Sequence, residues 1–328
     1  MDFFSGKKVL VAGAAGFVGT HLTQRLVSSG ALVRGTIHNS YPLLEINGVE
    51  YVRTNLETTI DCDLVTKNID YVFMCAANSS GAEVMTKTPL VHLTPNVIMN
   101  SQILAASYAN NVKKFCFISS NTVYPLTDFA VSEDDVTGEF FEKYFIVGWM
   151  KRFSELMCEM YATKVNKPMP TLIVRPGNLY GPFDKYKKNE SKVIAALIRR
   201  AFEKENPFEV WGDGEDIKDF LFIDDFIDAL LETFPRTSDF DIFNIASGVP
   251  ITIKEVLKHI IDISNNGTTK VNFDTTKPTM IPKRMIDISK INKRIGWYPK
   301  TSITQGLKMT FDWYANTYRD VTPEGNVK

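Results

Sequence analysis

Three glycines near the start of the chain are spaced so that they could hold a phosphate group. Gly13, Gly16 and Gly19 lie in the segment GAAGFVG, between the apolar run KKVLVA and a helical pattern over about residues 18–29. Glycine permits a tight turn and lets the backbone approach an anion, and the N-terminus of the following helix offers N–H groups to it. The strand before the loop and the helix after it favour a dinucleotide pyrophosphate over a plain turn.

The end of the expected second strand bears on which dinucleotide is bound. It reads GTIHNS, with Ile37 where an Asp or Glu would bond both ribose hydroxyls of NAD, followed by His38 and Asn39. Without that carboxylate a 2′-phosphate would not be repelled, and Arg34 or His38 could favour NADP. His38 could equally be a loop residue without a role, and Asn39 could bond a ribose hydroxyl. The sequence slightly favours NADP and does not exclude NAD.

The elements that would position this loop alternate along the first half of the chain. Short apolar runs such as DYVFMCAA and KKFCFISS alternate with helical patterns near residues 95–110 and 147–163, up to the run TLIVRP. This alternation predicts right-handed β-α-β crossovers and a parallel sheet covered on both faces. We therefore expect an α/β fold: a Rossmann doubly wound parallel sheet over residues 1–176 and a smaller mixed α/β lobe over residues 177–328. Some exchange of chain between the two parts is expected.

Composition excludes several classes of function. The chain of 328 residues has 37 Lys and Arg against 38 Asp and Glu, so no net field would recruit nucleic acid or an anionic membrane. It shows no signal-peptide pattern and no run of about 18 apolar residues. We expect a soluble, cytoplasmic protein without a bound metal. Its cysteines are too widely spaced for a zinc or disulfide framework; they are Cys62, Cys75, Cys116 and Cys158.

Over nearly its whole length the chain resembles the extended short-chain dehydrogenase/reductase superfamily, and within it the nucleotide-sugar epimerase/dehydratase family. The resemblance is carried by the glycine loop and by the segments SSNTVYP, RPGNLYGP, VWGDGEDIKDFLFIDD, FNIASG and KRMIDISKINKRIGWYP. It implies an enzyme that uses NAD or NADP and binds a nucleotide sugar in its C-terminal, substrate-binding lobe. The stretch NLYGPFDKYKKNESKVIAALIRRA resembles the diphosphate- and base-binding stretch of the GDP-fucose synthase branch.

The resemblance also implies roles for individual residues. Ser120 takes the position of the catalytic hydroxyl with Thr122 beside it, and Lys151 takes that of the lysine that anchors the nicotinamide ribose. The implied cofactor contacts are Gly13, Gly16, Phe17, Val18, Gly19, His38, Asn39, Asn55, Leu56, Ala76, Ala77, Asn78, Lys151 and Pro176. The implied contacts to the nucleotide diphosphate or base are Asn178, Lys192, Val193, Arg200, Trp211 and Lys218, with Arg284 a weaker candidate. Arg200 suits bidentate phosphate binding, although Arg200 and Lys218 could also be solvated surface charges.

One expected catalytic group is missing. In this superfamily a tyrosine four residues before the lysine, on the same helical face, exchanges a proton with the sugar hydroxyl. Aligned on the downstream helix, Lys151 fills the lysine position and Val147 the tyrosine position. If the helix already included Tyr144, seven residues would separate it from Lys151 by about 10 Å along the helix axis. Tyr144 could therefore replace the missing tyrosine only if it lay in a non-helical segment before the helix. The alternatives are a water held by Ser120 or Thr122 with Lys151, or loss of efficient turnover.

These departures narrow the expected chemistry. Where the GDP-fucose synthase branch uses Cys and His for epimerisation at C3 and C5, this chain has Thr122 and Lys192, and a threonine hydroxyl is too weak an acid to reprotonate a carbanion. Hydride transfer at C4 of a GDP-hexose or GDP-heptose requires the fewest catalytic groups: a nicotinamide, a polarising hydroxyl and a proton acceptor. A C4 epimerase, a 4,6-dehydratase and a cofactor-binding regulator without catalysis remain alternatives. The family commonly dimerises through two long helices, which implies a homodimer here.

Overall fold

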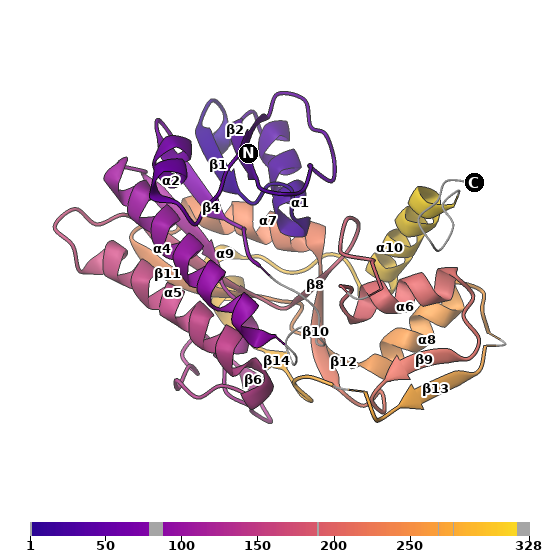
Figure 1. Cartoon of the computed structure of the whole chain (residues 1–328). Helices are drawn as coiled ribbons and strands as arrows, with labels where there is room; N and C mark the ends of the chain where they lie inside the picture. The colour runs from indigo at the N-terminus through magenta and orange to yellow at the C-terminus, as the bar shows by residue number, and fades with distance from the viewer. Residues whose placement is uncertain (1, 79–87, 189, 268, 278, 320–328) are drawn as a thin grey trace.

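The computed structural model describes residues 2–78, 88–188, 190–267, 269–277 and 279–319 (Figure 1). Its centre is a seven-stranded, wholly parallel sheet with the strand order β11-β7-β5-β4-β1-β2-β3. The strands are β1 Lys8–Ala12, β2 Leu32–Ile37, β3 Glu50–Arg53, β4 Tyr71–Met74, β5 Lys114–Ile118, β7 Thr171–Pro176 and β11 Phe240–Ile245. The order runs outward from β1 in both directions, which confirms the predicted Rossmann doubly wound sheet. The carboxyl ends of β1 and β4 mark the switch point at which such sheets bind ligands.

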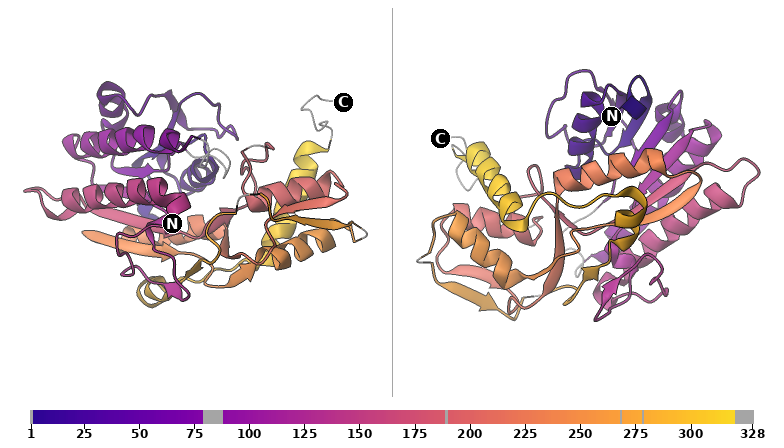
Figure 2. Two further views of the ribbon diagram at one scale, coloured as in Figure 1. Left: turned by 60° about the horizontal axis from the view of Figure 1, so that its bottom comes forward. Right: turned by 180° about the vertical axis from the view of Figure 1, so that it is seen from behind.

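Helices cover both faces of the sheet, as the near-continuous apolar runs of its strands require. Along β1, Val9 and Val11 face one core while Leu10 and Ala12 face the other, because side chains of a strand alternate between faces. The first core lies under α1 Phe17–Ser28, α7 Ile223–Thr233 and α9 Ser289–Ile295. The second lies under α2 Thr59–Thr66, α4 Thr94–Ala109 and α5 Phe145–Thr163. Figure 2, in its view from behind, shows α7 lying along the sheet.

The second part of the molecule has a smaller core of its own. Its helices are α6 Val193–Phe202, α8 Ile253–Ile263 and α10 Ile303–Tyr318, which pack with aromatic side chains such as Tyr180, Phe208 and Tyr314. A three-stranded sheet joins β12 Pro250–Thr252, β10 Ile217–Phe222 and β8 Asn178–Tyr180, and a two-stranded one joins β13 Val271–Asp274 to β9 Phe208–Trp211. This lobe lies beside the carboxyl ends of the large sheet (Figure 1).

The chain passes between the two parts after Pro176. Strand β11 returns to the edge of the large sheet beside β7, and β14 Met285–Ile286 pairs with β6 Ala130–Val131. The boundary expected at residue 176 stays a prediction, and the later segments contribute to both parts. The remaining short elements are 3-10 turns: η1 Asp2–Phe4, η2 Pro89–His92, η3 Asn121–Val123, η4 Glu142–Tyr144 and η5 Phe234–Arg236.

The lengths of the helices and the grouping of ionisable side chains bear on membranes and metals. None of the helices among the described residues has the length and apolar character needed to cross a membrane. Within the same residues, no group of three or more His, Cys, Asp or Glu side chains is arranged to hold a metal ion. All four cysteines are free thiols; Cys62, Cys116 and Cys158 are buried and Cys75 is partly buried.

Candidate active site

Gly13, in the loop between β1 and α1, and Gly19, in the first turn of α1, have no room for a side chain. Gly13 has φ +85°, and a Cβ there would lie 2.7 Å from the Cα of Ala76 at the end of β4. A Cβ on Gly19 would lie 2.1 Å from the carbonyl oxygen of Gly13. Helix α1 begins after Gly16 without a side-chain cap, which leaves N–H groups of its first turn for a ligand. This cradle fits a dinucleotide pyrophosphate at the helix N-terminus.

The side of the sheet expected to hold the adenosine ribose carries exposed polar residues. His38 and Asn39 follow β2 and are exposed. Arg34, by contrast, donates to Glu50 at 2.9 Å and to the carbonyls of Val65 at 3.1 Å and Lys67 at 3.2 Å. Arg34 is therefore committed to its neighbours in β3 and after α2, and its expected part in favouring NADP is not supported.

Two adenine-side residues lie in the turn between β3 and α2. The side-chain oxygen of Asn55 accepts the N–H of Glu57 at 3.1 Å, and the N–H of Asn55 donates to Asp61 at 2.8 Å. Leu56 is buried against the core under α2. The sequence expectation for Asn55 and Leu56 stays a prediction, since these contacts hold the turn itself.

The end of β4 lies next to the glycine loop. The N–H of Cys75 donates to the carbonyl of Ala12 at 3.0 Å, so Ala76 and Ala77 follow directly beside the loop. The backbone of Asn78 is held by the side chain of Asn96, which accepts its N–H at 2.8 Å and donates to its carbonyl at 2.9 Å. Asn96 on helix α4 thus holds in place the segment after β4 that is expected to contact the cofactor.

Ser120 and Thr122 form a pair of hydroxyls at the carboxyl end of β5. The Ser120 Oγ accepts the Thr122 N–H at 3.2 Å and its hydroxyl at 2.9 Å, so it caps the turn η3. Asn121, between them, donates to the carbonyl of Pro176 at 3.0 Å, which ties the turn to the end of β7. Because the Thr122 hydroxyl donates its proton to Ser120, the Ser120 hydroxyl is the one that can donate to a sugar oxygen.

Lys151 reaches this end of β5 from α5. Its Nζ donates to the carbonyl of Ile118 at 2.8 Å and lies 4.8 Å from the centre of the Phe117 ring. Burial lowers the pKa of Lys151 to about 8, while Glu155 acts in the opposite direction. The docking of α5 explains this reach, because a Cβ on Gly148 would lie 2.6 Å from the carbonyl oxygen of Thr122. The helix can approach η3 so closely only with glycine at that position.

Tyr144 is not activated in the structure. It ends the turn η4 and directly precedes α5, which is the non-helical approach that the sequence left open. Its hydroxyl makes no hydrogen bond within the described residues, and burial raises its pKa to about 12. A proton-transfer tyrosine needs a lowered pKa, so the surroundings of Tyr144 oppose that role. Val147, one turn before Lys151, is partly buried and has no ionisable group.

A buried network under the site was not expected from the sequence. Glu155 is fully buried and accepts the Ser119 hydroxyl at 2.6 Å as well as both donors of Arg175 at 2.8 Å. Arg175 also donates to the Tyr124 hydroxyl at 3.0 Å, and Tyr124 donates to Asn244 at 2.6 Å. Charged residues within apolar patterns, such as Arg in TLIVRP, are the signal that could have found this network.

On the substrate side, Asn178 and Lys218 lie on adjacent strands β8 and β10. The Asn178 side chain donates to the carbonyl of Asp219 at 3.0 Å. The Asp219 carboxylate accepts the N–H and hydroxyl of Ser247 at 2.7 and 2.8 Å and the N–H of Gly248 at 2.9 Å. Burial raises the pKa of Asp219 to about 6. This carboxylate therefore holds the loop after β11 against the expected substrate strands.

Lys218 and Arg284 place two cations near each other. Lys218 pairs with Asp216 at 3.1 Å and donates to the carbonyl of Ile281. Its pKa is lowered by burial and also by the charge of Arg284. Arg284 is 1% exposed and donates to the carbonyls that follow Ser120, Tyr124 at 3.1 Å and Pro125 at 2.9 Å. Its Nε is buried and finds no partner in the described residues, which suits an anionic ligand.

The other substrate candidates lie around α6 in the second part. Lys192 is exposed immediately before that helix and Val193 begins it. Arg200 pairs with Glu205 at 3.5 Å and donates to the carbonyl of Glu209. Trp211, 37% exposed, ends β9 and donates to the Glu209 side chain at 3.2 Å. Among the residues described, no hydrogen bond or ion pair joins this group to Lys218 or Arg284.

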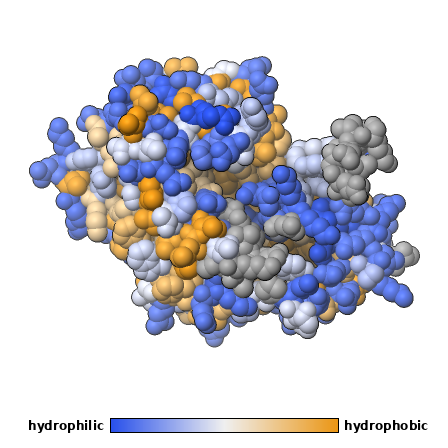
Figure 3. Space-filling view, viewed as in Figure 1, coloured by the Kyte–Doolittle hydropathy of each residue, from blue (hydrophilic) through white to orange (hydrophobic). Residues whose placement is uncertain are grey.

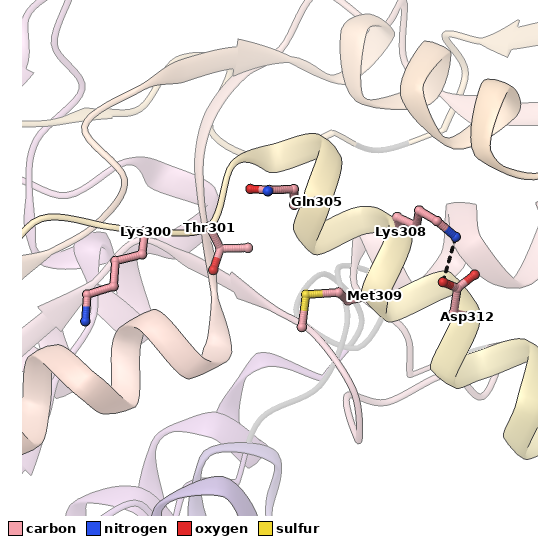
Figure 4. A pocket seen from close by; sticks show the side chains of 6 residues that line it. All are labelled: Lys300, Thr301, Gln305, Lys308, Met309 and Asp312. Atoms are coloured by element: carbon pink, nitrogen blue, oxygen red, sulfur yellow. Dashed lines mark hydrogen bonds and ion pairs between the residues drawn. The ribbon is translucent and has the colours of Figure 1, made fainter.

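A hollow of the surface lies away from the expected site residues. A hollow of about 370 Å³ lies along the start of α10 and is lined by Lys300, Thr301, Gln305, Lys308, Met309 and Asp312 (Figure 4). None of these is an expected site residue. Figure 3 shows a mostly hydrophilic surface over the second part and more hydrophobic side chains over the side of α4 and α5.

The chain is similar to known proteins in sequence and in fold. GDP-L-fucose synthase 1 of Arabidopsis thaliana is 28% identical over 326 residues, which cover 94% of this chain and 93% of the relative. GDP-mannose 3,5-epimerase 1 of Oryza sativa subsp. indica is 27% identical over 314 residues, covering 93% and 81%. The structure of UDP-glucuronic acid 4-epimerase from Bacillus cereus, in complex with UDP-glucuronic acid and NAD, matches with a TM-score of 0.83 and 27% identity over 95% of this chain and 100% of that one. The model of the NAD dependent epimerase/dehydratase family matches residues 9–246, and the chain therefore belongs to that family.

Proposed function

We propose that this family member is an NAD(P)-dependent oxidoreductase that acts at C4 of a nucleotide-activated sugar, a GDP-hexose or GDP-heptose, as a 4-dehydrogenase or 4-keto-reductase. The observation that carries the proposal is the meeting of Ser120, Thr122 and Lys151 at the carboxyl end of β5. The glycine cradle at Gly13 and Gly19 fits the dinucleotide, which when bound supplies or accepts the hydride.

In this proposal each side chain has a defined task. The Ser120 hydroxyl polarises the C4 oxygen by hydrogen bonding, and Thr122, which donates to Ser120, holds that hydroxyl in place. Lys151 anchors the nicotinamide ribose. With a pKa of about 8 it can also give or take a proton near neutral pH, through a water held with the two hydroxyls. This route takes the place of the phenol that Val147 does not provide.

The nucleotide sugar would lie between η3 and the second part of the molecule. Lys218 and the buried Arg284 are the cations proposed for its diphosphate, with Asn178 on the neighbouring strand. Lys192, Val193, Arg200 and Trp211 are proposed for the base end around α6. The preference for GDP is supported by the relatives named GDP-L-fucose synthase and GDP-mannose 3,5-epimerase.

We also propose a homodimer through α4 and α5. On α5 the exposed side chains include Trp149, Leu156 and Met160, and Trp149 stacks on Phe153 with ring centres 5.3 Å apart. Large exposed apolar side chains along one helix favour burial against a second copy. The oligomeric state in solution, measured by light scattering, tests this part.

A C4 epimerase is the second candidate, favoured by the match to the UDP-glucuronic acid 4-epimerase structure. In that reaction the hydride leaves C4 and returns to it, so no reduced cofactor accumulates. The same residues would serve both reactions. A regulator that binds cofactor without turnover is the third, favoured by Val147 and by the raised pKa of Tyr144.

One experiment separates these functions. The purified protein is incubated with NAD, NADP or their reduced forms and with GDP-, UDP- and CDP-sugars, and the absorbance of reduced nicotinamide is followed while the sugars are analysed by NMR. A net change of absorbance with one sugar supports the oxidoreductase, and interconversion without net change supports the epimerase. Cofactor binding with neither supports the regulator. A protein that binds no nicotinamide coenzyme contradicts all three.

A further inference from the structure

We propose that Arg53, the last residue of β3, binds the 2′-phosphate of NADP and makes this protein prefer NADP(H) over NAD(H). The inference rests on the proposed function, since it concerns the coenzyme of that site. Arg53 differs from Arg34 and His38, the two residues whose positions in the sequence suggested them as the cation.

The register of the sheet brings Arg53 to the ribose side. β2 and β3 are parallel, and Ile37 is the register partner of Arg53. Ile37 stands where an acidic residue would bond the ribose hydroxyls of NAD. Register partners on neighbouring parallel strands are about 4.8 Å apart and present their side chains to the same face of the sheet. Arg53 thus projects from the position beside the one that reads the ribose.

The guanidinium of Arg53 lies over the turn that follows β2. Its Nη1 donates to the carbonyl of His38, and its central carbon lies 5.7 Å from the centre of the Tyr41 ring. A carbonyl and an aromatic face thus hold the side chain across the segment next to the expected ribose site. An arginine positioned in this way needs little further ordering to take an anion.

The charge of Arg53 has no carboxylate partner in the part of the chain that the structure describes. Arg34, on the neighbouring strand, pairs with Glu50 instead. The segment IHNSYPLL that crosses this edge has no acidic residue before Glu45. One of five guanidinium N–H groups is used by the His38 carbonyl, and the others suit the oxygens of a phosphate monoester.

An exposed arginine that merely caps a carbonyl is the competing explanation. It would bind the two coenzymes alike, because NAD and NADP differ only by the 2′-phosphate. Ile37 cannot bond the ribose hydroxyls as an acidic residue would, so the usual cause of a preference for NAD is absent. That absence does not by itself attract the 2′-phosphate of NADP. The positive charge of Arg53 supplies the attraction for this phosphate.

The test measures binding, not turnover. Dissociation constants for NADPH and NADH are measured by fluorescence, and those for 2′,5′-ADP and 5′-AMP by calorimetry, on the wild type and on Arg53→Gln, Arg53→Lys and Arg34→Gln. We expect the wild type to favour NADPH and 2′,5′-ADP. Arg53→Gln should lose about 10- to 100-fold in affinity for both 2′-phosphate ligands and leave NADH unchanged, as loss of a charge-assisted contact implies. Arg53→Lys should fall between, and Arg34→Gln should match the wild type.

The outcomes separate this inference from the function beneath it. If the wild type binds neither coenzyme, the proposed function fails and the inference with it. If it binds both coenzymes and Arg53→Gln changes neither affinity, or if NADH is preferred, only the assignment of Arg53 is overturned. A loss in Arg34→Gln of the size expected for Arg53→Gln overturns it as well. Thermal unfolding of each variant shows whether a loss reflects misfolding, and the unchanged NADH affinity provides the second control.

Discussion

Arg175 and Glu155 form a two-point ion pair in the core beneath the site, with Nε to Oε1 and Nη2 to Oε2 both at 2.8 Å. Neither side chain is more than 1% exposed. Glu155 lies one turn after Lys151 on α5, and it also accepts the hydroxyl of Ser119, the residue before Ser120. The pair therefore connects β7, β5 and α5, and it supports Ser120 and Lys151, two of the three side chains proposed for catalysis.

Breaking this pair should destabilise the protein strongly. Glu155→Gln leaves the Arg175 guanidinium buried without its counter-charge, which costs about 3 to 5 kcal/mol in the free energy of unfolding. Urea denaturation measures the change. The matched control is Asp312→Asn in the exposed pair Lys308–Asp312 on α10, with an expected cost below about 1 kcal/mol. Equal costs for the two variants would contradict the structural role of the buried pair.

Restoring the missing phenol should raise turnover. Val147→Tyr places a tyrosine four residues before Lys151, whose charge can lower the pKa of that phenol. General acid–base catalysis is worth about 100- to 10,000-fold in rate, so we expect an increase in kcat of at least tenfold with the substrate found in the sugar panel. Val147→Phe, with the same ring and no hydroxyl, should show no increase. An equal gain from both variants would assign the effect to packing.

Activity should fall on the alkaline side near the pKa of Lys151. Burial lowers that pKa to about 8, so the ammonium is present below this pH and is lost as the pH rises through it. If the charged form serves catalysis, kcat/KM decreases above about pH 8. Lys151→Arg should retain partial activity without that decrease, because arginine stays protonated.

Lys151→Met is the companion variant. This variant should have low activity at every pH, because methionine has no positive charge and no ionisable proton to transfer. A decrease near pH 8 that persists in Lys151→Arg would assign the titration to another group, of which Lys114, with a pKa also lowered by burial to about 8, is one.

Adding one methyl group to the glycine loop should abolish tight coenzyme binding. A Cβ at Gly19 would lie 2.1 Å from the Gly13 carbonyl oxygen, so loop and helix must separate. We expect Gly19→Ala to lose at least about 1.4 kcal/mol of coenzyme binding free energy, a factor of about ten. Gly267→Ala is the control, because a Cβ there meets nothing within 4 Å. Titration of both variants with reduced coenzyme checks this, and an unaffected Gly19→Ala would place the pyrophosphate elsewhere.

Local patterns in the sequence predicted much of the fold. The alternation of apolar runs with helical patterns predicted the β-α-β order, because the period of a strand and of a helix is written in consecutive residues. The helix expected over residues 147–163 is α5 Phe145–Thr163, and the helix expected over 95–110 is α4 Thr94–Ala109. The edge position of β11 next to β7 could not be predicted, since nothing local specifies which strand it joins.

The sequence by itself determined that a glycine loop follows the first strand and that the chain resembles its family over nearly its whole length, and it predicted that Val147 stands where that family has a tyrosine. Only the tertiary structure decided that Arg34 is committed to Glu50, that Arg53 stands beside Ile37, and that Arg175 lies against Glu155. The reason is physical. Spacing along the chain sets local geometry, whereas the partner, the burial and hence the pKa of a charged group depend on residues that meet only when the sheet is assembled.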